Sequence, residues 1–195
     1  MIWNDHWQVR RLVKDSHAFL SPSKYHWLNY SEEKMLEVYS SFQASQIGTK
    51  KHEYAKMAIE LGITQKKSKK TICAYINDAI AFGMKPEQLL FYSENCFGTA
   101  DAILWDERKK ILRIHDLKTG TIPAHMEQLL IYAAIFCLEY KNQIPPLGSF
   151  DIELRIYQND NVVAYIPEPD EIATIMAKIV AADKLIESQK LYLGG

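Results

Sequence analysis

The sequence predicts an α/β (α+β) fold in which helices flank a mixed central sheet. The apolar period is helical up to residue 83 and then changes to the spacing of strands, in three segments between residues 89 and 118. A long apolar segment, two more strand-like segments and an amphipathic segment follow. This order of helices, three strands, a buried helix, two strands and a helix is typical of a sheet covered on both faces.

Three helices are expected before the sheet, at residues 31–42, 50–61 and 71–82. Ser31 has the hydroxyl of a good N-cap, and acidic residues follow it in the first turn. Gly48-Thr49 is expected to separate the first helix from the second. Gly62 and Gly83 stand where a left-handed residue would close the second and third helices.

Five strands are expected, at residues 89–97, 99–105, 111–118, 150–158 and 162–166. The polar turn at 106–110 predicts a hairpin between the second and third strands, and Asn159-Asp160 predicts another between the last two. Thr121 and Pro123 are typical of a helix start. The segment from Ala124 to Tyr140 is apolar on almost every face, so we expect a buried helix there.

We expect one domain over residues 1–195, because a chain of 195 residues suits a single domain. Its parts are a helical N-terminal part at 1–85, the core sheet and buried helix at 86–167, and a C-terminal helix at 168–195. That last helix runs from about 169 to 190. Its expected buried stripe consists of Ile172, Ile175, Met176, Ile179 and Ile186.

The composition is that of an ordinary globular protein, with 48% hydrophobic and 24% charged residues. No apolar run approaches the ~20 residues that span a bilayer, and the mixed segment Met1 to Asp15 is unlike a secretory signal. We therefore expect no membrane partner and a cytoplasmic location. Cys73, Cys96 and Cys137 form no CxxC pair, which argues against a zinc ribbon or a four-cysteine iron–sulfur cluster and favours buried free thiols.

Charge is distributed unevenly along the chain. The net charge of −1 argues against a globally basic DNA-binding protein. The segment from Gly48 to Lys70, however, has seven lysines and two glutamates, a formal charge of +5. A local patch of this kind can hold phosphates, and a solvated lysine-rich loop is the equally good alternative.

Two acids and a lysine in the central strands form the strongest chemical pattern. Asp116 and Lys118 are two apart in a predicted strand and therefore share a face, while Leu117 points into the core. The hairpin around residues 106–110 brings Asp101 of the partner strand near Asp116. Two converging carboxylates repel each other unless a divalent cation lies between them. The pattern therefore indicates a metal site with a lysine beside it.

Several ordered motifs, within about residues 17–135, resemble those of the PD-(D/E)XK nuclease superfamily. They are Gly98-x-x-Asp101, Asp116-Leu117-Lys118-Thr119-Gly120, Gln128-x-x-x-Tyr132, Gly48-Thr49-x-x-His52-Glu53 and Ser21-Pro22-Ser23-x-x-x-Trp27-Leu28. They are most similar to the RecB-like branch, which includes lambda-exonuclease-like enzymes, and to its phage-type single-domain members. The resemblance implies a restriction-endonuclease-like αβββαβ core, in agreement with the element order above.

The resemblance also implies roles for individual residues. The implied metal ligands are Asp101, Asp116, the backbone carbonyl of Leu117 and, as in members that hold two ions, His52. Lys118 would orient or activate the attacking water. The implied supporting residues, for Lys118 or for the substrate phosphate, are Gln128, Tyr132 and Ser23. One or two Mg²⁺ or Mn²⁺ ions, and no iron–sulfur cluster, are expected.

These patterns together predict a metal-dependent DNA nuclease, with an exonuclease expected from the branch that it resembles. Two alternatives remain open: a nucleic-acid-binding or assembly module that does not cleave, and a hydrolase of RNA or another phosphoester. DNA is the expected partner. A second copy of the chain and a recombination or replication protein are further candidates, since a small chain with one modest basic patch needs help to enclose DNA.

Overall fold

The computed structural model describes residues 18–193, which fall into two compact units that meet between Ile47 and Gly48. The described part of the first unit contains a 3-10 helix, η1 (Pro22–Asn29), and the first half of helix α2 (Glu32–Glu60). The second unit contains the remainder of α2 and all the strands. The expected single domain stays a prediction, and the sheet, its covering helices and the candidate site described below lie in the second unit.

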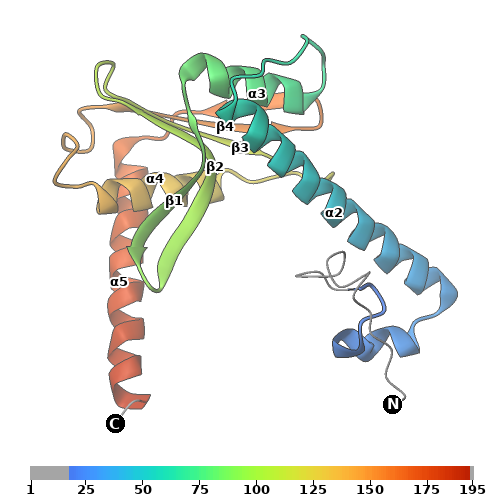
Figure 1. Cartoon of the computed structure of the whole chain (residues 1–195). Coiled ribbons are helices and arrows are strands. Elements are labelled where there is room, and N and C mark those ends of the chain that lie inside the picture. Colours follow the sequence, from blue (N-terminus) through green and yellow to red (C-terminus); the bar gives the residue numbers. More distant parts are fainter. Residues whose placement is uncertain (1–17, 194–195) are drawn as a thin grey trace, which may run out of the picture. The chain divides into compact units, whose positions relative to one another are not determined.

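The second unit is built on one five-stranded sheet, and the predicted α/β fold with a mixed sheet is confirmed (Figure 1). The strands lie in sequence order: β1 (Lys85–Ser93), β2 (Cys96–Asp106), β3 (Ile111–Leu117), β4 (Asp151–Gln158) and β5 (Asn161–Tyr165). The pair β3–β4 is parallel and the other three pairs are antiparallel. A parallel pair needs a long crossover, which here contains helix α4 (Glu127–Glu139).

Helices cover both faces of this sheet, as the sequence predicts. Figure 1 shows α4 on one side of β3 and β4 and helix α3 (Thr71–Phe82) on the other. One buried cluster joins α4, the sheet and helix α5 (Pro169–Leu193), and a second joins α2, α3 and the opposite face of the sheet. Seven of the 13 residues of α4 are buried, so the expectation of a buried helix is confirmed. No helix of residues 18–193 is long and apolar enough to cross a lipid bilayer.

The expected break between two helices at Gly48-Thr49 is wrong, because α2 runs without interruption from Glu32 to Glu60. Gly48 is needed for close packing instead. A Cβ at this position would lie 2.7 Å from Oγ1 of Thr119, which follows β3. The predicted helix ends are confirmed: Gly62 and Gly83 have φ angles of 65° and 71°, in the left-handed region.

The expected strand at 89–97 is also wrong, since a turn at Glu94-Asn95 separates β1 from β2. Contacts from a distant helix hold this turn. Ser93 Oγ and Asn95 Nδ2 donate hydrogen bonds of 2.6 and 2.8 Å to the carboxylate of Asp183 in α5. No local sequence pattern reports these contacts.

Three smaller expectations need correction. Helix α4 begins at Glu127 rather than at Ala124, because Gln158 holds the preceding loop by accepting the Ala124 N–H and donating to the Gly120 and Ile122 carbonyls. The buried stripe of α5 stops before Ile186, which is 42% exposed. All three cysteines are free, as expected, but only Cys137 is fully buried.

A polar chain, buried at His115 and Tyr157 and partly exposed at Asp78, lies on the α3 side of β3 and β4. The hydroxyl of Tyr157 donates a 2.7 Å hydrogen bond to Asp78 of α3 and lies 3.2 Å from Nδ1 of His115. Both His115 and Tyr157 are completely buried. Burial, helped by the charges of two arginines, lowers the pKa of His115 to about 3, so its imidazole is neutral. His115 therefore belongs to the core and faces away from Asp116.

We predict that Tyr157→Phe lowers the free energy of unfolding by about 1–2 kcal/mol, because Asp78 loses a buried donor. Tyr165→Phe is the matched control, since the Tyr165 hydroxyl donates an exposed bond of 2.8 Å to Glu171; we expect a change below about 0.5 kcal/mol. Urea denaturation measures both. Equal losses in the two variants would show that the buried chain contributes no special stability.

Candidate metal centre

Three acidic residues occupy successive cross-strand positions of β1, β2 and β3. The β2–β3 register ends at Ala102 opposite His115, so the next opposed positions are those of Asp101 and Asp116. The β1–β2 register omits one pair between Pro86–Ala102 and Gln88–Ala100, and that pair is Glu87 and Asp101. The strand pairing is therefore interrupted where the three carboxylates lie.

Asp101 is the central member of this row, and its side chain is 18% exposed. Its Oδ2 accepts a 2.9 Å hydrogen bond from the backbone N–H of Leu117 and lies 3.4 Å from Nδ1 of His52 in α2. Burial, and then the charge of Asp116, raises the pKa of the Asp101 carboxyl to about 6, although the Leu117 bond acts in the opposite direction.

Asp116 is the most deeply buried acid of the site, at 3% exposure. Nζ of Lys118 forms an ion pair with its Oδ2 at 3.0 Å. Apart from this ammonium group, no donor among the described residues reaches that oxygen. Burial raises the pKa of Asp116 and the charge of Lys118 lowers it, with burial the larger effect. A buried carboxylate compensated by one lysine alone, beside a second carboxylate, fits a divalent cation.

A short polar chain from α4 holds Lys118 in place. Nζ of Lys118 donates a 2.6 Å hydrogen bond to Oε1 of Gln128, and Nε2 of Gln128 lies 3.4 Å from the hydroxyl of Tyr132. Gln128 and Tyr132 are one turn apart in α4 and share a face. Gly98 in β2 makes room for Tyr132, because a Cβ there would lie 2.9 Å from Cε1 of the ring. The structure thus brings the predicted supporting pair to the predicted lysine.

Glu87 is a candidate ligand that the sequence reasoning missed. One ligand atom each from His52, Glu87 and Asp101 lie within 4.8 Å of one another. Glu87 has a φ of 50°, in the left-handed region that non-glycine residues seldom adopt. Strain of this kind gathers at functional sites. The strand register could have identified Glu87. A strand that begins at Lys85 places Glu87 opposite Asp101, whereas the expected strand began at residue 89.

Leu117 and Ser23 are the two remaining residues that the sequence predicts for the site. The Leu117 side chain packs in the α2–α3 core, as expected, and its carbonyl as a ligand stays a prediction. Ser23 lies in the first compact unit, where its hydroxyl is 2.8 Å from that of Ser21. Its expected role in phosphate binding also stays a prediction.

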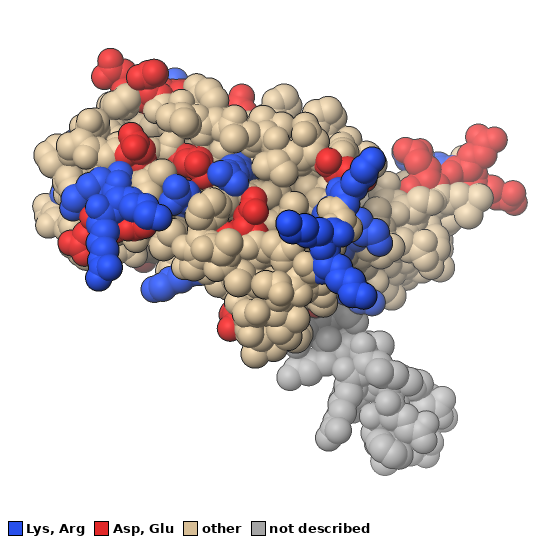
Figure 2. All heavy atoms as spheres, turned by 90° about the horizontal axis from the view of Figure 1, so that it is seen from above, with Lys and Arg blue, Asp and Glu red and all other residues tan. Residues whose placement is uncertain are grey.

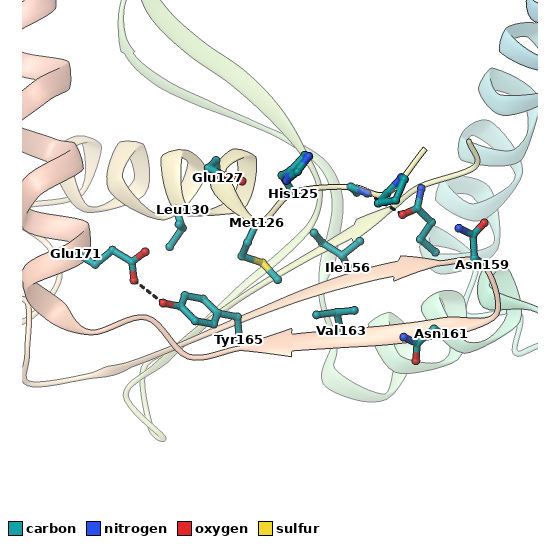
Figure 3. A pocket seen from close by; sticks show the side chains of 13 residues that line it. His125, Met126, Glu127, Leu130, Ile156, Asn159, Asn161, Val163, Tyr165 and Glu171 are labelled. Carbon is teal, nitrogen blue, oxygen red and sulfur yellow. Dashed lines mark hydrogen bonds between the residues drawn. The ribbon is translucent and has the colours of Figure 1, made fainter. Parts of the chain in front are cut away.

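A hollow of about 750 Å³ lies away from these acids, between the start of α4 and the β4–β5 hairpin (Figure 3). Figure 3 shows His125 and Glu127 at the start of α4, with the Tyr165–Glu171 hydrogen bond on the other side. Its lining includes none of the residues of the candidate metal centre, which are His52, Glu87, Asp101, Asp116 and Lys118. The size of this hollow therefore does not make it the chemical centre.

We predict that Asp101→Asn stabilises the metal-free protein at pH 7.5. The folded-state pKa of about 6 exceeds the ordinary value of 3.8, so the folded protein binds this proton more tightly than the unfolded chain does. The stabilising effect of the protonated carboxyl is present below about pH 4 and is lost as the pH rises through 6. The amide oxygen of the variant side chain still accepts the Leu117 N–H.

The expected gain in EDTA at pH 7.5 is on the order of 1–3 kcal/mol and largely disappears at pH 4. Added Mn²⁺ should stabilise the native chain and leave the variant nearly unchanged. Thermal and urea unfolding at the two pH values measure these differences. A variant that is less stable at pH 7.5 would show that Asp101 is not held under electrostatic strain.

Comparisons of the sequence with protein-family models and with curated proteins found no match. They therefore show no family for this chain, and the resemblance of its motifs to PD-(D/E)XK nucleases remains an expectation. What the protein does has to be inferred from the geometry and chemistry of the site itself.

Proposed function

We propose that this protein is a divalent-cation-dependent nuclease that hydrolyses phosphodiester bonds of DNA, with exonuclease action expected. One observation carries the proposal: the partly buried Asp101 and the buried Asp116 occupy opposed positions of β2 and β3, and Lys118 is the one cationic side chain of the described residues that pairs with Asp116. Two carboxylates held together in the interior destabilise the protein unless they bind a cation.

The oxygen-rich donor set suits Mg²⁺ or Mn²⁺. Asp101, Asp116 and the Leu117 carbonyl would hold one ion, and His52 and Glu87 would share Asp101 with a second. A cation bound there supplies charge neutralisation for the phosphate and a water molecule of lowered pKa. Asp101 would serve both ions, because it is the middle member of the row of acids.

Lys118 is the residue that we infer acts on the substrate. Its side chain is 30% exposed, so it contacts both Asp116 and solvent. The Gln128 and Tyr132 chain fixes its ammonium group, which makes it a pre-positioned donor for a water molecule or a phosphate oxygen. Its positive charge also favours the negative charge that develops on a phosphate during hydrolysis.

Purified protein should degrade end-labelled DNA in Mg²⁺ or Mn²⁺ and not in EDTA. We predict that Asp116→Ala and Lys118→Ala each slow this reaction about 100-fold or more. Asp106→Ala and Lys109→Ala are matched controls, because this acid–lysine pair lies in the β2–β3 hairpin at 3.9 Å, with the lysine 72% exposed. We expect the controls to retain full activity.

The substrates should include linear and circular DNA and RNA of the same sequence, so that one assay reports the ends required and the nucleic acid preferred. If all four variants cleave at the native rate, the assigned centre is wrong. If the native chain binds DNA and no substrate is cleaved in either ion, the chain is a binding module rather than a nuclease.

Glu87→Gln is predicted to weaken the second ion by about tenfold while the first is retained, since the neutral amide keeps the size of the side chain and removes its charge. Calorimetric titration with Mn²⁺ measures this as the loss of the weaker of two binding events. Glu94→Gln, in the exposed β1–β2 turn, is the control. Unchanged titration of the Glu87 variant would remove this residue from the centre.

A further inference from the structure

We propose that a pocket next to the metal centre binds an internal backbone phosphate of the DNA strand, beside the bond that is cleaved. The pocket lies at the end of β3, between α2, the start of α3 and the β4–β5 turn. Its polar lining consists of Lys51, Lys70, Thr71, Lys118, Thr119, Asn159 and Asp160. The position relative to the cleaved bond rests on the proposed function, whereas the binding of a phosphate does not.

The pocket has the size and position for this role. Its volume is about 460 Å³, within the range of ~300–1,000 Å³ typical of small-ligand sites. Leu117 and Lys118 belong both to its wall and to the metal centre, through the bonds to Asp101 and Gln128. Lys51 directly precedes His52 in α2. The pocket and the carboxylates are therefore close enough to contact one bound strand.

Charge in the pocket favours an anion. Three lysines and one acidic residue line it. Among the described residues, no ion pair includes Lys51 or Lys70. Asp160 is turned toward α3, where its Oδ1 lies 3.3 Å from the N–H of Thr71 and its own N–H donates to Thr71 Oγ1 at 2.7 Å. Its carboxylate is thus engaged by α3.

The remaining donors suit phosphate rather than a carboxylate of a protein partner. The first turn of α3 contains no acidic residue, and Asp160 is the one carboxylate of the pocket lining at this end of the helix. Threonine hydroxyls and lysine ammonium groups are common phosphate contacts. Figure 2, seen from the α3 side, shows lysine and arginine side chains gathered in patches rather than spread evenly.

The test measures binding of the full chain to a short fluorescein-labelled single-stranded DNA by fluorescence anisotropy in EDTA, where cleavage is blocked. We predict that Lys51→Ala and Lys70→Ala each weaken binding about fivefold and reduce the slope of log K against log salt by ~0.7. Lys69→Ala is the matched control. Like Lys70→Ala, it removes one positive charge from the exposed segment before α3, but Lys69 does not line the pocket. We expect it to stay within twofold of native.

Equal weakening by all three variants, or by none, would overturn the pocket assignment. The DNA is used with a 5′-phosphate and with a 5′-hydroxyl. An effect of Lys70→Ala that is the same for both supports an internal phosphate, and an effect confined to the phosphorylated end would overturn it. Because EDTA prevents turnover, this result stands apart from that of the cleavage assay, so either proposal can fail without the other.

Discussion

Two carboxylates held together inside the protein are the constraint on which the site depends. Asp101 and Asp116 face each other where the pairing of β2 and β3 ends, and both have raised pKa values because they are buried. Like charges in a medium of low polarity repel strongly. The surrounding sheet and its two apolar clusters must therefore supply the stability that this pair removes, as functional sites generally require.

The rest of the second unit can be understood as a frame for that pair. Helix α4, which the parallel β3–β4 pairing requires as a crossover, also presents Gln128 to Lys118. Helix α2 brings His52 to Asp101 and packs closely past Thr119 because Gly48 has no side chain. The strained backbone of Glu87 completes the row of acids from β1. Elements far apart in sequence thus converge on the same point of the sheet, around Asp101 of β2.

The sequence was sufficient for the parts of this arrangement that are local. The polar turn at 106–110 defines one hairpin, and counting residues outward from it places Asp101 opposite Asp116. Glu87 could not be found in this way, because its register depends on a turn at Glu94-Asn95 that Asp183 of α5 holds from a distance. The helix break expected at Gly48 was wrong for the same reason, because this glycine allows a close tertiary contact and does not end a helix. The lysine-rich segment predicted phosphate binding in general, but only the fold separates Lys70 from Lys69.

The central claim is that the Asp101–Asp116 pair binds a divalent cation. The most direct measurement is anomalous diffraction from crystals of the full chain grown or soaked in Mn²⁺. We predict a strong anomalous peak within ligand distance of both carboxylates, and a second between Asp101, Glu87 and His52 at higher Mn²⁺. Well-ordered Asp101 and Asp116 side chains with no peak between them, at a concentration that produces peaks elsewhere on the protein, would contradict the account.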